Sequence, residues 1–133
     1  MVLLKQKKKL KKEYYGLTGN QLKQLKSEGT IIENIVETPF LCYLGDTDKN
    51  VFDEEKIIAK YPIIMIECTF IFDETNRADE TKHMHWDYLN DFVKDHPDNT
   101  FILYHFSQRY KPDEIENFFE KLNIKNVIPW ISR

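Results

Sequence analysis

"PIIMIECTFIF", residues 62–72, is apolar except near its middle, where Glu67, Cys68 and Thr69 follow one another. An almost unbroken apolar run is typical of a strand that is buried on both faces, as in a sheet covered by helices. Runs of the same kind occur before and after it. We therefore predict four strands, near residues 40–46, 62–70, 100–106 and 127–131.

Helical signals separate these runs. "DEEKIIAKY", residues 53–61, has acidic residues in its first turn, and Asp53 is its predicted N-cap. "MHWDYLNDFVKDH", from Met84, and "KPDEIENFFEKLNI", from Lys111, have apolar residues at helical spacing. The predicted buried positions of these two helices are Trp86, Leu89, Phe92, Val93, Ile115, Phe118, Phe119 and Leu122. The stretch "DETNRADETKH" is predicted to be a polar loop. The order β-α-β-α-β-α-β predicts an α/β fold with a helix-covered sheet.

Length and composition suit one domain over residues 1–133, since 41% of the residues are hydrophobic and no repeat or linker divides them. Residues 1–12 are a basic lead-in that could be flexible, and a short helix around Leu22 and Leu25 is expected after it. The lead-in is either a solubilising tail or a sequence-independent contact to a phosphate backbone. In the second case its RNA-binding residues would be Lys8, Lys9, Lys11 and Lys12.

The two cysteines, Cys42 and Cys68, lie in apolar runs and form no CxxC pair, so we predict reduced core thiols. No apolar stretch reaches the roughly 18–20 residues that cross a bilayer. The N-terminus does not resemble a signal peptide. We therefore expect a soluble, intracellular protein of the cytoplasm or nucleus, with no membrane partner.

Polar residues recur at the carboxyl ends of the predicted strands, the edge where ligands bind in open α/β sheets. Asp46, in "LGDT", could form a turn that caps its strand, or could be a bridging ligand for two metal ions. Glu67 lies in a strand so apolar that it must be paired. It is either a structural salt-bridge partner or a carboxylate that orients a catalytic histidine.

Two histidine segments follow. His83 and His85, in "KHMHW", have H-x-H spacing at a predicted helix start, so their rings should diverge and one of them should do the chemistry. His105, in "YHFSQRY", could be a satisfied structural histidine at a strand end. The polar loop after it suits a phosphate group, and Arg109 could bind that group bidentately. These segments together predict a polar site at one sheet edge.

Taken in order, the segments resemble the C-terminal half of ribonuclease Z (tRNase Z), an endonuclease of the metallo-β-lactamase superfamily that trims tRNA 3′ ends. "YLGDT" is similar to the family's G-D-T segment, and "MIECTF" to its H-E-A-T segment. "KHMHW" is similar to a later histidine motif, with His83 in the family position, and "YHFSQRY" to H-F-S-x-R-Y. The basic residues before "YLGDT" are similar to the family's lead-in. Four motifs in the same order are more specific than any one alone.

The resemblance implies a metallo-β-lactamase-like αββα sandwich, of which this chain is the C-terminal half. It implies two zinc ions, with Asp46 bridging them and His105 binding one. Glu67 and His83 would form the pair that assists phosphodiester cleavage. Arg109 and the lysines would hold the RNA backbone, and the substrate would be precursor tRNA.

The sequence also departs from the family. The family's metal site needs H-x-H-x-D-H and a further histidine from its N-terminal half, and the chain has no H-x-H-x-D-H. Asp46 and His105 are two ligands, whereas catalytic zinc usually has three and a water. A complementing N-terminal half or a homodimer partner is therefore expected. The alternatives are a non-catalytic remnant or RNA-binding subunit of the same fold, and an unrelated small α/β domain whose motifs agree by chance.

Overall fold

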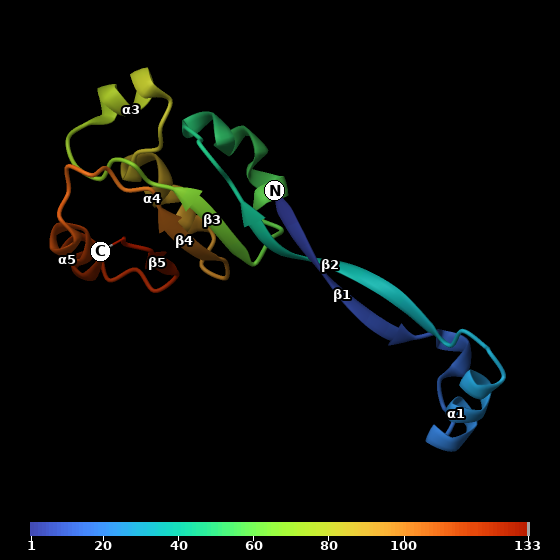
Figure 1. The fold of residues 1–133 in the computed structure, drawn as a ribbon. Coiled ribbons are helices and arrows are strands. Elements are labelled where there is room, and N and C mark those ends of the chain that lie inside the picture. Colours follow the sequence, from blue (N-terminus) through green and yellow to red (C-terminus); the bar gives the residue numbers. More distant parts are fainter. Residues whose placement is uncertain (133) are drawn as a thin grey trace. The chain divides into compact units, whose positions relative to one another are not determined.

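Strand β3 (Ile63–Glu67) lies at the centre of a five-stranded sheet of order β1-β2-β3-β4-β5. The computed structural model describes residues 1–132. Strands β2 (Glu33–Tyr43), β4 (Thr100–Tyr104) and β5 (Val127–Pro129) form the parallel part of the sheet with β3. Figure 1 shows β3 and β4 side by side. The α/β prediction and the four strand positions are confirmed, although β2 begins earlier than residue 40.

The chain divides into two compact units. The first contains Met1–Leu3 and the chain from Pro39 onward, and the second is Leu4–Thr38. The first unit contains the hydrophobic core. Side chains on one face of its sheet alternate inward, and Ile64, Ile66, Phe101 and Leu103 are almost completely buried there. They pack in one cluster with residues of helices α2 (Glu55–Ile58), α4 (Trp86–Asp95) and α5 (Pro112–Leu122).

The helices begin and end near the predicted positions, with three corrections. Their bounds are α1 Gly19–Ser27, α2 Glu55–Ile58, α3 Thr75–Thr81, α4 Trp86–Asp95 and α5 Pro112–Leu122, and the 3₁₀ helices are η1 Lys12–Tyr14 and η2 Lys49–Glu54. Asp53 is not the N-cap: it lies inside η2, where Asp48 caps by accepting the Asn50 N–H at 3.0 Å. The predicted polar loop contains α3, and Leu122 is 38% exposed because it lies in the last turn of α5.

The second unit is a two-stranded ribbon with a helix at its end (Figure 1). The ribbon is antiparallel, since Lys5 is bonded to Thr38 whereas Lys11 is bonded to Ile32. Strand β1 (Val2–Leu10) was not predicted, because its lysines give no apolar face to recognise. Helix α1 has a capping box, in which Thr18 and Gln21 each accept a backbone N–H from the other.

The second face of the sheet in the first unit is apolar and incompletely covered. Ile128 is 51% exposed and Trp130 is 62% exposed. Tyr43, Met65 and Tyr104, which alternate with the buried residues of their strands, are only partly buried. Monomeric proteins rarely expose contiguous apolar surface of this kind unless something binds it. The sheet therefore has one face packed against helices and one face open to a further layer.

Both cysteines are free and buried, as predicted. Burial, followed by the negative charges of Glu67 and Asp87, raises the pKa of the Cys68 thiol well above its usual value, and burial also raises the pKa of Cys42. We expect Cys68 in the folded chain to react with a thiol reagent at least 10-fold more slowly than in the urea-unfolded chain, because each unit of raised pKa lowers the thiolate population about 10-fold.

The same shift has a consequence for stability. The folded state holds the Cys68 proton more tightly than the unfolded state, so the free energy of unfolding should fall as pH rises above the ordinary thiol pKa of 9.0. Thiol labelling and urea unfolding between neutral and alkaline pH measure both effects. Equal labelling of the folded and unfolded chains would contradict the expectation.

No helix among residues 1–132 is both long and apolar enough to cross a membrane.

Candidate functional site

Three of the predicted site residues lie where neighbouring parallel strands end. Asp46 follows β2, Glu67 is the last residue of β3, and His105 follows β4 directly. Because β2, β3 and β4 are adjacent and parallel, their carboxyl ends meet at one edge of the sheet. The register therefore brings together residues that are 21 and 38 positions apart in sequence.

Glu67 is the buried centre of this edge, with a side chain that is 1% exposed. Its Oε1 accepts the backbone N–H of Thr47 at 2.9 Å and lies 2.9 Å from Nδ1 of His83. Its Oε2 accepts the hydroxyl of Thr69 and lies 3.1 Å from the same His83 nitrogen. The predicted contact between Glu67 and His83 is thus present, and both carboxylate oxygens are hydrogen-bonded, as a buried carboxylate requires.

His83 reaches Glu67 because of the way helix α3 ends. Lys82, after the last residue of α3, has a left-handed backbone with φ of 55°, and the His83 N–H donates to the carbonyl of Ala78 at 2.9 Å. This is a common way to end a helix, and it turns the chain sharply. The turn directs His83 toward the sheet edge, with 27% of its side chain exposed.

His105 also has a left-handed backbone, with φ of 61°, at the point where β4 stops. Its ring is 53% exposed, and its Nδ1 lies 3.2 Å from the hydroxyl oxygen of Thr69 and 3.6 Å from Oε2 of Glu67. The ring centroids of His83 and His105 are 5.6 Å apart. Both imidazoles therefore stand over the same buried carboxylate.

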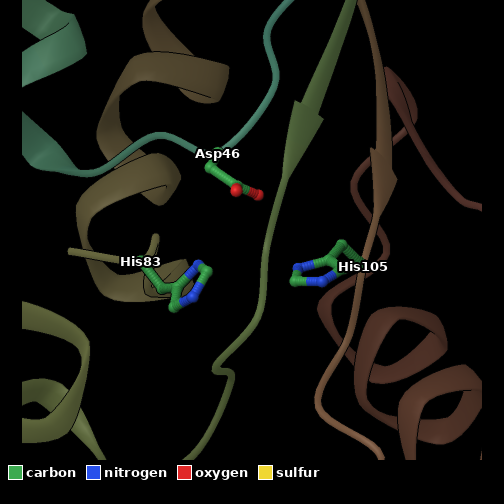
Figure 2. Close-up of side chains that lie close together, drawn as sticks. All are labelled: Asp46, His83 and His105. Atoms are coloured by element: carbon green, nitrogen blue, oxygen red, sulfur yellow. The ribbon is translucent and has the colours of Figure 1, made fainter. Parts of the chain in front are cut away.

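Asp46, His83 and His105 form a possible metal-binding group. One ligand atom from each lies within 4.8 Å of the others. Figure 2 shows the three side chains converging on a common space, each from a different segment. Nδ1 of each histidine has a hydrogen-bonding partner, so Nε2 is the nitrogen left to bind a cation. The sequence had assigned His83 only to a catalytic pair, and the structure brings it beside Asp46 and His105.

His85 lies apart from this group, as the expected divergence of the two rings implies. Its side chain is fully buried, Nδ1 accepts the N–H of Asp87 at 2.9 Å, and Nε2–H donates to the carbonyl of Phe72. It is the N-cap of α4. With both nitrogens used, His85 has a structural role.

Tyr104 and Thr69 were missed by the sequence analysis. The Tyr104 hydroxyl donates to the carbonyl of Leu44, two residues before Asp46, and its ring stacks on Tyr43 with centroids 5.5 Å apart. Burial and then the hydrogen-bonding neighbour Tyr43 raise the pKa of Tyr104, so the hydroxyl keeps its proton. Tyr104 thus ties the Asp46 loop to the strand that precedes His105. A lone tyrosine in an apolar run gives no sign of such a bond.

The predicted RNA-binding residues lie in different units. Arg109 is exposed in the turn after His105, where its backbone N–H donates to Ser107 Oγ at 3.3 Å. A cavity of about 450 Å³, lined in part by His105, Ser107, Gln108 and Trp130, opens beside this turn. Lys8, Lys9 and Lys12 are exposed and Lys11 is half-buried, all in the second unit.

Comparison with curated proteins finds relatives over most of the chain. The chain is 36% identical over 120 residues to tRNase Z TRZ1 of Arabidopsis thaliana. This alignment covers 87% of the chain and 43% of the relative. It is 30% identical over 135 residues to the chloroplastic tRNase Z TRZ2 of the same plant. That alignment covers 96% of the chain and 38% of the relative. A ribonuclease Z of Staphylococcus epidermidis is 25% identical over 91 residues. No protein-family model matches the chain. The chain spans about two-fifths of the length of the plant relatives.

Proposed function

Since this chain is a ribonuclease Z-like segment, we propose that it supplies part of the active site of a metal-dependent phosphodiesterase that processes the 3′ end of precursor tRNA. The observation that carries the proposal is the convergence of Asp46, His83 and His105 over the buried Glu67. The names of the relatives supply the substrate class. The open apolar face of the sheet supports the further proposal that the chain forms the C-terminal half of a metallo-β-lactamase-like sandwich.

The donor set fits zinc. One carboxylate and two imidazoles are the oxygen and nitrogen ligands that zinc takes in catalytic sites. Asp46 and His105 would hold the ions, and Asp46 is exposed enough to bridge two of them. When bound, the metal would supply Lewis-acid stabilisation of phosphate oxygens and activation of water. The buried Glu67 carboxylate, which lies beneath both histidines, also favours a cation at this site.

Glu67 and His83 would form the acid–base pair of the reaction. The carboxylate holds the Nδ1–H of His83, which would leave Nε2 free to meet a phosphodiester. A histidine held in this way can give a proton to the leaving oxygen. Arg109 and the cavity beside His105 would contact nucleotides next to the scissile phosphate. The exposed lysines of the second unit would hold the RNA backbone without reading its sequence.

The site needs ligands from elsewhere. Asp46 and His105 are too few ligands for two zinc ions, even if His83 is counted with them, and the chain has no H-x-H-x-D-H motif. The open apolar face, which includes Ile128 and Trp130, gives a complementing half a surface to pack on. We propose that such a half, supplying the missing histidines and the second sheet, completes the enzyme.

The test measures zinc and cleavage together. The chain is purified alone and after co-expression with the N-terminal part of a tRNase Z. We expect weak zinc binding alone, about two zinc ions per complex as in two-metal sites, and release of a 3′ trailer from precursor tRNA only by the complex. Asp46→Asn should lower both zinc affinity and the cleavage rate by more than about 100-fold. This is more than the loss typical of residues that only hydrogen-bond to a metal ligand.

Asp95→Asn, which changes an exposed carboxylate at the end of α4, is the matched control and should leave both quantities unchanged. A complex that forms but holds no zinc and cleaves nothing would contradict the proposal. RNA binding by that complex would then favour the alternative of a non-catalytic RNA-binding subunit.

A further inference from the structure

Thr69 connects the buried carboxylate to the second histidine. Its side chain lies between Glu67 Oε2, to which the hydroxyl donates, and His105 Nδ1, which is 3.2 Å from the hydroxyl oxygen. Thr69 itself is buried, with 8% of its surface exposed. His105 is 3.6 Å from Glu67 Oε2, which is too far for a direct hydrogen bond. The hydrogen-bonded connection between Glu67 and His105 therefore runs through Thr69.

The directions of these hydrogen bonds follow from counting protons. An ionised carboxylate can only accept hydrogen bonds. The single hydroxyl proton of Thr69 is therefore donated to Glu67. The Thr69 oxygen can then only accept from His105, which requires a proton on His105 Nδ1. Glu67 imposes the same arrangement on His83 directly, at 2.9 Å.

We propose that Thr69 is a positioning residue that relays the Glu67 carboxylate to His105, holding the imidazole in the Nδ1–H tautomer with Nε2 presented to the space it shares with Asp46 and His83. One carboxylate thus orients two histidines, one directly and one through a hydroxyl. The chemical purpose is ligation, because a neutral imidazole binds a metal through the nitrogen that carries no proton. The ligand role of His105 rests on the proposed function, but the tautomer does not.

The test uses ¹⁵N NMR of the histidine rings of the full metal-free chain at alkaline pH, where the imidazoles are neutral. The unmodified chain should show His105 and His83 as Nδ1–H. In Thr69→Val, which keeps the shape and removes the hydroxyl, the ratio of Nδ1–H to Nε2–H at His105 should fall about 5- to 10-fold, the factor for one lost hydrogen bond. His83 should not change, and Thr69→Ser should retain the unmodified ratio.

Glu67→Gln offers a second, opposite test. A glutamine amide can donate to the Thr69 oxygen, which frees the Thr69 proton to donate to His105 Nδ1. We expect His105 to become Nε2–H while His83, facing the glutamine carbonyl, stays Nδ1–H. His85 is the internal control in every sample, because its contacts with Asp87 and Phe72 hold it as Nε2–H. An unchanged His85 signal shows that a variant is folded.

An unmodified chain with His105 as Nε2–H, or a Thr69→Val chain in which the ratio of Nδ1–H to Nε2–H at His105 is unchanged, would overturn the proposal. In the complemented protein, Thr69→Val should weaken zinc affinity about 10- to 100-fold, the loss typical of partners behind a ligand, and Thr69→Ser should not. Failure of the proposed function would give a different result, namely no zinc in the unmodified complex. The His105 tautomer measured in the metal-free chain would not be affected by that result.

Discussion

Glu67→Gln is expected to lower the cleavage rate of the complemented, zinc-loaded protein by about 10²- to 10⁴-fold, the usual contribution of a general acid or base. The substitution preserves the shape of a side chain that is 1% exposed and removes its charge. His83 then loses the carboxylate that would stabilise its imidazolium form. His105 loses the hydrogen-bond direction that leaves its Nε2 free.

The measurement is single-turnover cleavage of a precursor tRNA with a 3′ trailer, with zinc content determined on the same samples. Glu120→Gln, an exposed carboxylate on α5, is the matched control and should cleave at the unmodified rate. If Glu67→Gln retained cleavage within about 10-fold of the unmodified protein, Glu67 would be a structural residue only. Normal zinc content with lost cleavage would show that the effect lies in the chemistry and not in metal binding.

Phe101→Ala is expected to destabilise the first unit by about 3–5 kcal/mol, the range for removing a buried phenylalanine. Phe101 is fully buried in β4, where it lies opposite Ile64 of β3 and Val127 of β5 in the register. Its ring also packs edge-on against Phe92 of α4, with centroids 5.5 Å apart. A loss of this size is a large share of the about 5–15 kcal/mol that stabilises an ordinary domain.

Urea unfolding followed by circular dichroism measures this loss. Ile128→Ala is the control on the opposite face of the sheet, where the side chain is 51% exposed, and should cost less than about 1 kcal/mol in the isolated chain. If the proposed complementing half packs on the open face, the same substitution should weaken its binding, because Ile128 lies on that face. A loss below about 1.5 kcal/mol for Phe101→Ala would contradict the packing described for the core.

The sequence predicted the parts of the fold that bury an apolar face. The four parallel strands and the helices α4 and α5 were found because burial leaves a pattern of apolar residues. Strand β1 and the first part of β2 left no such pattern, since they form a ribbon in which nearly every residue is exposed. Helix α3 was missed because its sequence, TNRADET, contains a single buried residue, Ala78.

The candidate site was predictable where it depends on strand ends and not where it depends on turns. Asp46, Glu67 and His105 follow from the order of strands in a parallel sheet. The position of His83 next to Asp46 depends on the left-handed turn at Lys82. No residue pattern in the sequence predicts that turn. The hydrogen bond between Thr69 and His105 and the one between Tyr104 and Leu44 join residues that are 36 and 60 positions apart, so they appear only in three dimensions.

The left-handed backbone at His105 lowers the stability of the fold, whereas the imidazole at this position is needed for the proposed function. This conformation costs a residue with a Cβ up to about 1–2 kcal/mol relative to glycine, although asparagine, aspartate and histidine adopt it more readily than other residues. A glycine at position 105 would relieve the strain but leave the sheet edge without an imidazole. If the site binds a metal as proposed, a descendant released from that function would gain stability by replacing His105 with glycine. The residue is thus a sensitive marker of whether the site is still in use.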